Sequence, residues 1–197
     1  EIEMVRGVAK NVFIPLSVGG GIRNLQDMRD VLLAGAEKVS VNSLAVRDPS
    51  IISQGAKAFG NQCIVLGMDA LKVGESEKTP SGYEVVVKGG RERTGIDAVA
   101  WAMRAQDLGA GEICVNSIDA DGTKAGFELE ITSKIVRALT IPVIASGGAG
   151  KPEHLAEVLM PGVGADAALV ASLTHIDGYT VAQLKQAIAS KGIPVRI

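Results

Sequence analysis

Two glycine-rich segments have the residue types of an anion-binding turn. Gly19-Gly20-Gly21 and Ser146-Gly147-Gly148 each follow a short apolar run and precede a segment with helical periodicity. Glycine lets backbone N–H groups approach an anion closely, and the N-terminus of the following helix adds a favourable dipole. For a single Gly-Gly pair, the need for a tight turn is as good an explanation as phosphate binding. Because the pair occurs twice, we favour a phosphate site at each of the two turns. The side chains expected beside these turns are Asn42 and Ser43 in the first site and Ser172 in the second.

Three carboxylates follow apolar runs and are candidates for catalysis or binding. Asp69 ends the run Cys63–Asp69, and Asp119 and Asp121 follow the next such run. A partly desolvated carboxylate at the end of a buried strand suits general acid–base catalysis, which makes Asp69 the candidate catalytic residue. The alternative is a structural Asp69 that accepts hydrogen bonds from loop amides. Asp121 and Gly122 either contribute to the second phosphate site, which we favour, or form an Asx turn.

Six short apolar runs, separated by amphipathic segments, would position these residues. The runs are continuous rather than alternating, as is typical of parallel strands buried on both faces. Segments with helical spacing lie between and after them, such as Ala98–Leu108 and Val181–Ala189. This alternation predicts an α/β fold with a parallel sheet. The predicted strands are Val12–Val18, Lys38–Asn42, Cys63–Asp69, Glu112–Ser117, Pro142–Ala145 and Ala167–Ala171.

The two glycine turns belong to an internal repeat. Gly20 and Gly147 are offset by 127 residues, and Ile14-Pro15 and Ile141-Pro142 share that offset. Two such halves would need about 254 residues, close to the ~250 residues of a closed (β/α)8, or TIM, barrel. The chain of 197 residues is about 60 short of that size. We therefore predict one domain over residues 1–197, an incomplete (β/α)6 barrel with strands equivalent to strands 3–8 of the TIM barrel.

The segment Val73–Lys88 interrupts the regular order of elements with Gly74, Pro80 and Gly82. We expect an added hairpin there, after the third strand. Loops that follow barrel strands carry function, so this excursion is either an active-site cover or a plain surface hairpin.

Composition and charge exclude several classes of protein. The net charge of -2 gives no broad basic surface for nucleic acid. No apolar run approaches the ~20 residues that span a bilayer, so we expect a cytoplasmic protein with no membrane contact. His154 and His175 lack metal-ligand spacing, and neither a metal nor a cofactor is expected. We expect His154 at the surface, Trp101 in the core, and both Cys63 and Cys114 as reduced core residues.

Six motifs follow one another along essentially the whole chain. They are Val18-Gly-Gly-Gly-Ile-Arg23, Lys38-Val-Ser-Val-Asn-Ser43, Gly67-Met-Asp-Ala70, Ser117-Ile-Asp-Ala-Asp-Gly-Thr-Lys124, Ala145-Ser-Gly-Gly-Ala-Gly150 and the terminal Gly192-Ile-Pro-Val-Arg196. In their order and spacing these motifs resemble one enzyme family, the cyclase subunit of imidazole glycerol phosphate synthase, from histidine biosynthesis.

The resemblance implies a lyase that uses ammonia from a partner glutaminase. Its substrate would be a ribulosyl-formimino aminoimidazole carboxamide ribonucleotide, which carries two phosphates. The products would be imidazole glycerol phosphate and aminoimidazole carboxamide ribonucleotide. By position, Asp69 matches one of two catalytic aspartates. The phosphate positions are Gly20, Gly21, Asn42 and Ser43 in one site and Asp121, Gly122, Gly147, Gly148 and Ser172 in the other.

The resemblance also implies a route for ammonia. Lys38 and Glu112 match half of a charged ring that gates an ammonia channel, and Glu37 and Gln62 lie where the family contacts its glutaminase. The family's second catalytic aspartate and two further gate residues belong to strands that this sequence lacks. Asn116 stands where threonine is more usual, and Gly89 where a polar residue is expected. We therefore expect this chain alone to be a poor cyclase.

Two other functions remain open from the sequence. One is the phosphoribosyl-formimino isomerase of the same pathway, which also binds a two-phosphate ligand on a duplicated barrel. The other is a non-catalytic barrel fragment that self-associates. An open sheet would expose strand edges at Val12–Val18 and Ala167–Ala171, so we expect a homo-oligomer that covers them. The run Asp121-Gly-Thr-Lys124 and the charged strand starts favour the cyclase.

Overall fold

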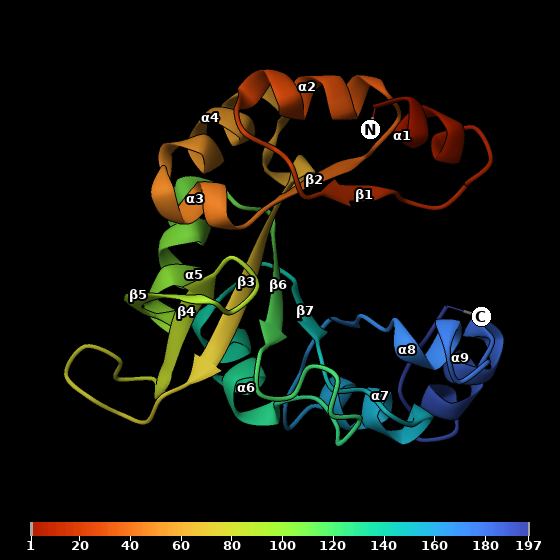
Figure 1. Ribbon diagram of the computed structural model, residues 1–197. Coiled ribbons are helices and arrows are strands. Elements are labelled where there is room, and N and C mark those ends of the chain that lie inside the picture. Colours follow the sequence, from red (N-terminus) through yellow and green to blue (C-terminus); the bar gives the residue numbers. More distant parts are fainter. Residues whose placement is uncertain (1, 197) are drawn as a thin grey trace. The chain divides into compact units, whose positions relative to one another are not determined.

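The computed structural model describes residues 2–196, which divide into two compact units (Figure 1). The first unit comprises the chain up to Gly67 together with Ala102–Ile113, and the second comprises Met68–Trp101 and the chain from Cys114 onward. Three elements have residues in both units, namely β3 (Ile64–Lys72), α5 (Ala98–Leu108) and β6 (Glu112–Ser117).

Parallel strands with intervening helices build the first unit. β1 (Ser17–Gly19) pairs with β2 (Lys38–Val41), and β2 pairs with the start of β3, where Val39 lies opposite Ile64. α2 (Leu25–Leu33) and α4 (Ser50–Phe59) lie together on one side of β1 and β2 (Figure 1). The other elements of this unit are α1 (Ile2–Ala9), α3 (Ser43–Arg47) and the 3-10 turn Asn61–Cys63.

Close packing in the first unit depends on a glycine in α4. Met28 of α2, Ile52 of α4 and Ile64 of β3 are fully buried. A β-carbon on Gly55 would lie 2.8 Å from Ile64 Cδ1 and 3.1 Å from Met28 Sδ. The absence of a side chain at Gly55 therefore lets α4 rest directly on α2 and β3.

The second unit continues the sheet from β3 through β6 and β7 (Val143–Ser146) to β8 (Ala167–Ala168). β7 and β8 are parallel, with Ile144 opposite Ala167. The helices of this unit are α6 (Leu129–Ala138), α7 (Pro152–Leu159), α8 (Ser172–His175) and α9 (Val181–Ala189).

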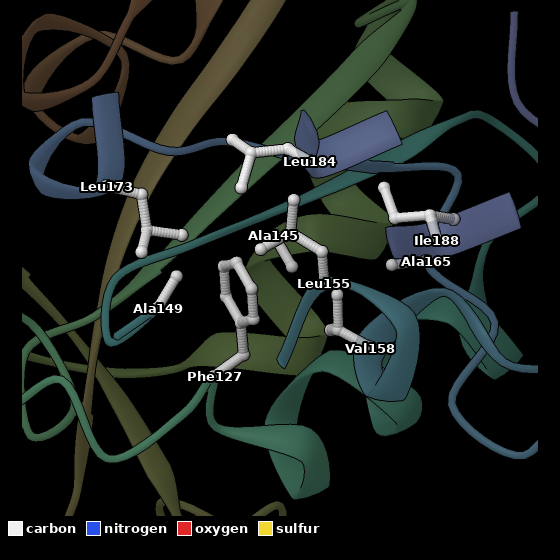
Figure 2. Packing of buried hydrophobic residues seen from close by; sticks show 9 residues of the cluster. All are labelled: Phe127, Ala145, Ala149, Leu155, Val158, Ala165, Leu173, Leu184 and Ile188. Atoms are coloured by element: carbon white, nitrogen blue, oxygen red, sulfur yellow. The ribbon is translucent and has the colours of Figure 1, made fainter. Parts of the chain in front are cut away.

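A hydrophobic cluster holds α7 and α9 beside β7 (Figure 2). The ring of Phe127 points into this cluster, whose other members are Ala145, Ala149, Leu155, Val158, Ala165, Leu173, Leu184 and Ile188. Ala145 and Ala149 flank the second glycine turn. Their burial therefore fixes the backbone on both sides of Gly147 and Gly148.

An antiparallel ribbon follows β3. β4 (Tyr83–Val87) pairs with the end of β3, where Tyr83 lies opposite Lys72. β5 (Glu92–Asp97) pairs with β4, where Arg93 lies opposite Val86. The sequence does not predict β5, because its polar residues form no apolar run.

A buried carboxylate joins β4 to β5. Glu84 is buried and accepts hydrogen bonds from the Arg93 guanidinium and, at 2.8 Å, from the Gly95 N–H. The Arg93 guanidinium, together with that backbone donor, holds the pKa of the Glu84 carboxyl below its usual range. The hydrogen bonds of the Glu84 carboxylate therefore hold β4 and β5 together in addition to apolar packing.

The predicted bounds of the first and last strands are wrong. No strand forms over Val12–Leu16, where Phe13 is 94% and Ile14 71% exposed and where Pro15 has no N–H for a ladder. The Val12 N–H instead bonds to the Val8 carbonyl at 3.0 Å, next to the end of α1. At the other end, β8 stops at Ala168 and Leu169 is 46% exposed. An apolar run without alternation does not show where pairing begins or ends.

Several single-residue expectations are tested by burial. Trp101 is buried, as expected. Cys63 and Cys114 are reduced, as expected, but both are only half-buried, so the prediction that they lie in the core is wrong. Within residues 2–196, no helix combines the length and the apolar character needed to cross a bilayer.

Candidate functional site

The first glycine turn opens a cavity between β1 and α2. Gly20 and Gly21 adopt left-handed φ angles of 84° and 71°, which a residue with a side chain rarely tolerates. A cavity of about 550 Å³ lies over this turn. Its lining includes Arg23, Ser40, Asn42, Ser43 and Arg47. The structure therefore brings together all four residues predicted for the first phosphate site.

Two further glycines, not predicted as site residues, keep this cavity open. A β-carbon on Gly19 would lie 2.9 Å from Ser40 Cβ, and one on Gly67 would lie 3.1 Å from Ser40 Oγ. The small residues at 19 and 67 thus leave room around Ser40. Both glycines lie in motifs of the sequence, Gly19 in Gly19-Gly20-Gly21 and Gly67 in Gly67-Met-Asp-Ala70, but neither motif shows that they approach Ser40.

The second glycine turn has the same local plan. Gly147 and Gly148 adopt φ angles of 87° and 103° between β7 and α7. A cavity of about 460 Å³ lies over them. Asp121, Gly122 and Ser172 line it, as the sequence predicts. Lys124 and Asn116 also line it and were not predicted as site residues.

Backbone-to-backbone contact explains why glycine is needed at this second turn. The Gly126 N–H donates to the Gly148 carbonyl at 2.8 Å, and a β-carbon on Gly148 would overlap the Gly126 carbonyl. The loop after β6, which carries Asp121 and Gly122, is thereby seated on the glycine turn.

Asp69 lies half-buried on β3, where it is held by the end of β6. Asn116 Nδ2 donates to Asp69 Oδ1 at 3.1 Å. The Ile118 N–H donates to the Ala70 carbonyl at 2.9 Å, and the Lys72 N–H donates to Asp119 Oδ2 at 2.8 Å. Three hydrogen bonds therefore tie the strand that carries Asp69 to the loop of the second cavity. Asn116 is the polar residue that sequence reasoning missed, although its place on β6 next to the Ser117–Lys124 motif is a usable signal.

A second cluster of charges fixes the antiparallel ribbon to α6. Glu130 accepts hydrogen bonds from Lys134 Nζ at 2.8 Å, Lys72 Nζ at 2.9 Å and the Tyr83 hydroxyl at 3.0 Å. Lys134, followed by the other two donors, lowers the pKa of the Glu130 carboxyl to about 2. Burial and the neighbouring carboxylates raise the pKa of Tyr83 above its usual value.

Lys38 and Glu112 form an ion pair in the first unit. Lys38 Nζ lies 3.0 Å from both carboxylate oxygens of Glu112, and the two side chains are 30% and 15% exposed. The residues begin β2 and β6 respectively. Glu37 and Gln62, predicted for a partner surface, are both exposed.

The prediction that His154 lies at the surface is wrong. His154 is buried in α7, and its Nδ1 accepts the Gly150 N–H at 3.1 Å. The helical pattern alone does not show that the glycine turn folds back over this residue. Among the described residues, no group of three His, Cys, Asp or Glu side chains is arranged to hold a metal ion.

Parallel strands with glycine cavities at their carboxyl ends define an α/β protein consistent with the TIM-barrel class. The family model described as histidine biosynthesis protein matches residues 1–180. The curated relatives include the imidazole glycerol phosphate synthase subunit HisF of Desulfatibacillum aliphaticivorans, which is 63% identical over 99% of this chain. The HisF subunits of Syntrophobacter fumaroxidans and Desulfovibrio desulfuricans are 62% and 57% identical. This chain belongs to the HisF family of cyclase subunits, and it spans 75% of the length of these relatives.

Proposed function

We propose that this chain carries out the cyclase and lyase reaction of imidazole glycerol phosphate synthase. A ribulosyl-formimino aminoimidazole carboxamide ribonucleotide would react with ammonia to give imidazole glycerol phosphate and aminoimidazole carboxamide ribonucleotide. The observation that carries this proposal is the position of Asn116, which binds Asp69 and also lines the cavity of the second glycine turn. A candidate proton-transfer group and a candidate phosphate site are thus joined by one side chain.

Each unit would supply one phosphate site. In the first, Gly20, Gly21, Asn42 and Ser43 would hold one phosphate of the substrate. In the second, the residues are Asp121, Gly122, Gly147, Gly148 and Ser172. The left-handed glycines support this assignment, because they let backbone amides approach an anion that a side chain would keep away.

Asp69 would serve as general acid or base. Asn116 donates to one of its oxygens at 3.1 Å, which restricts the orientation of the carboxylate. A positioned group of this kind contributes about 10²- to 10⁴-fold to a rate.

Lys38, Glu112, Glu37 and Gln62 would serve the delivery of ammonia. The Lys38–Glu112 pair would form part of a gate through which ammonia passes, and the exposed Glu37 and Gln62 would contact the glutaminase subunit that generates it. The partial burial of both side chains supports a gate more than a solubilising role.

Further features belong to the same proposal. Residues 1–197 would form one barrel domain, a (β/α)6 barrel whose strands correspond to strands 3–8 of a (β/α)8 barrel. A homo-oligomer would cover the outer strands, which is supported by the exposed Phe13 and Ile14 next to β1. The isomerase alternative is not favoured by any of the curated relatives named above, which are all HisF subunits.

Ammonia-dependent turnover of the ribulosyl substrate tests the proposal, with free ammonia replacing the glutaminase. We expect turnover, and a loss of about 10²-fold or more in Asp69→Asn. Asp107→Asn, which changes an exposed aspartate of α5, is the matched control. Unchanged turnover in Asp69→Asn would show that Asp69 is not the acid–base group.

Substrate binding, measured alongside, keeps the test informative if turnover is slow. We expect Ser172→Ala to weaken binding and Asp69→Asn to retain it. An ordinary enzymatic rate for the unmodified chain would contradict the expectation that it is a poor cyclase. Absence of both turnover and substrate binding would overturn the proposed function.

A further inference from the structure

The second cavity is lined by a lysine, Lys124, whose ammonium group already forms an ion pair. Lys124 is the only lysine or arginine among the described residues that line this cavity. Its Nζ lies 2.6 Å from Asp177 Oδ1 and 2.9 Å from Asp177 Oδ2. The carboxylate belongs to the segment just after α8, next to Ile176, which also lines the cavity. The positive charge available to an anion is therefore neutralised by Asp177.

The backbone of Lys124 is fixed to the glycine turn. Lys124 adopts a left-handed φ of 59°, a conformation that is uncommon for a residue with a side chain. A β-carbon on Gly150 would overlap the Lys124 carbonyl, so these two backbones are in direct contact. Non-glycine residues are found in this conformation where the surrounding structure holds them, often at binding sites.

The side chain of Lys124, in contrast, is free to change partners. The side chains of Lys124 and Asp177 are 45% and 25% exposed, and an ion pair as exposed as this one contributes little to stability. A lysine ammonium is a compact charge on a flexible stem with three rotatable donors. A phosphate dianion offers it more charge and more acceptor atoms than one carboxylate does.

The acidic residues at this cavity favour such an exchange. Asp121 belongs to the proposed phosphate site, but its carboxylate repels an anion, and Asp177 lies beside the cavity. A phosphate that entered would meet both negative charges, and Lys124 is the lining side chain that can offset them. The glycine amides alone would have to overcome this repulsion.

We propose that Lys124 exchanges partners when a phosphate binds at the second glycine turn. Asp177 holds the ammonium while the cavity is empty, and the phosphate takes it over when it binds. Asp177 is then an electrostatic competitor that sets the phosphate affinity of this site. This inference rests on the proposed phosphate-binding role of the same turn.

A titration with inorganic phosphate tests the exchange. The amide NMR signals of Gly147 and Gly148 report the second site specifically.

We expect Asp177→Asn to tighten phosphate binding about two- to fivefold, because the competing charge is removed. We expect Lys124→Met to weaken it about tenfold or more, and Lys124→Arg to retain most of the affinity. In the Lys124→Met background, Asp177→Asn should have much less effect. Lys191→Met and Glu157→Gln are matched controls on the exposed faces of the same unit.

The outcomes separate this inference from the proposed function. If Asp177→Asn weakens phosphate binding, the pair is a structural clamp and the exchange is wrong. Equal effects of Asp177→Asn with and without Lys124 would also overturn it. If the Gly147 and Gly148 signals of the unmodified chain do not respond to phosphate at all, the phosphate site itself is wrong. Unfolding of each variant in urea, measured in parallel, identifies any change caused by loss of the fold.

Discussion

Asn116 Nδ2 donates a hydrogen bond to Asp69 Oδ1 over 3.1 Å. The other end of the same amide, Asn116 Oδ1, would lie 2.7 Å from a β-carbon placed on Gly147. One amide therefore bonds to the candidate acid–base group and lies beside the glycine turn. A polar residue in this position restricts the carboxylate, and it would limit the movement of Asp69 relative to a phosphate at the proposed site.

Replacing Asn116 with alanine should lower the rate of ammonia-dependent turnover about tenfold. The loss of one hydrogen bond to a charged group corresponds to about 1.5 kcal/mol or more. The KM for the substrate should change less than kcat, because the glycine amides remain. Steady-state kinetics check this prediction, with Gln186→Ala on the exposed face of α9 as control. An unaltered kcat in Asn116→Ala would remove Asn116 from the positioning role.

The glycines of the two turns should respond differently to alanine. Gly20 has a φ of 84° and nothing within 4 Å of an added β-carbon, so Gly20→Ala should destabilise the fold by about 1 kcal/mol, the cost of the left-handed conformation. Gly148 has a φ of 103°, and its β-carbon would overlap the Gly126 carbonyl. Gly148→Ala should therefore cost about 3 kcal/mol or more.

Urea unfolding of the two variants measures this difference. Phosphate binding at the second turn should be lost in Gly148→Ala, because the loop that carries Asp121 can no longer rest on it. Equal destabilisation by the two substitutions would mean that contact with Gly126 contributes nothing.

The sequence predicts much of this architecture because the signals are local. The continuous apolar runs locate β2, β3 and β6, and the period of apolar residues locates α5 and α9 to the residue. The internal repeat identifies both glycine turns and the serines that follow them. These features depend on neighbouring residues along the chain, which is the information that a pattern contains.

The sequence does not predict contacts between distant segments. Asn116 meets Asp69 across 47 positions, and Lys124 meets Asp177 across 53. The pattern places His154 at the surface because it shows the helix and not the glycine turn that folds over it. The exposed Phe13 and Ile14 illustrate the opposite error, since an apolar run predicts burial only where something covers it.

The Lys38–Glu112 pair should show an asymmetric response to mutation. Lys38→Met leaves the less exposed Glu112 carboxylate without its ammonium, and we expect a loss of about 1 to 3 kcal/mol in the free energy of unfolding. Glu112→Gln leaves the more exposed lysine, which water can solvate, and should cost less than about 1 kcal/mol. The double variant Lys38→Met/Glu112→Leu should recover part of the loss. Equal costs for both single variants would indicate that solvation of the two partners is the same.

The proposed gate predicts a separate kinetic effect of the same variants. With the glutaminase subunit present, glutamine-dependent turnover should fall in Lys38→Met relative to turnover with free ammonia. A structural pair with no part in ammonia delivery would change both rates equally. The ratio of glutamine-dependent to ammonia-dependent turnover therefore distinguishes a gate from a purely structural pair.

Glu130 should make the stability of the chain depend on pH in acid. Its folded-state pKa of about 2 lies below the ordinary value of 4.5, because Lys134, Lys72 and Tyr83 stabilise the carboxylate. The stabilisation is therefore complete above about pH 4.5 and is lost progressively as the pH falls toward 2. In Glu130→Gln this part of the pH dependence should disappear, so the difference in unfolding free energy between the two proteins should shrink from pH 5 to pH 2.

Urea unfolding at a series of pH values measures that difference, and Glu157→Gln on α7 is the control for loss of an exposed glutamate. Lys72 stays protonated throughout the range, since the same contact raises its pKa further above 10.5. The change can then be attributed to the carboxyl group. A difference between Glu130→Gln and the unmodified chain that stays constant from pH 5 to pH 2 would show that Glu130 is not stabilised as an anion, and that the ribbon is held on α6 by packing around Tyr83 instead.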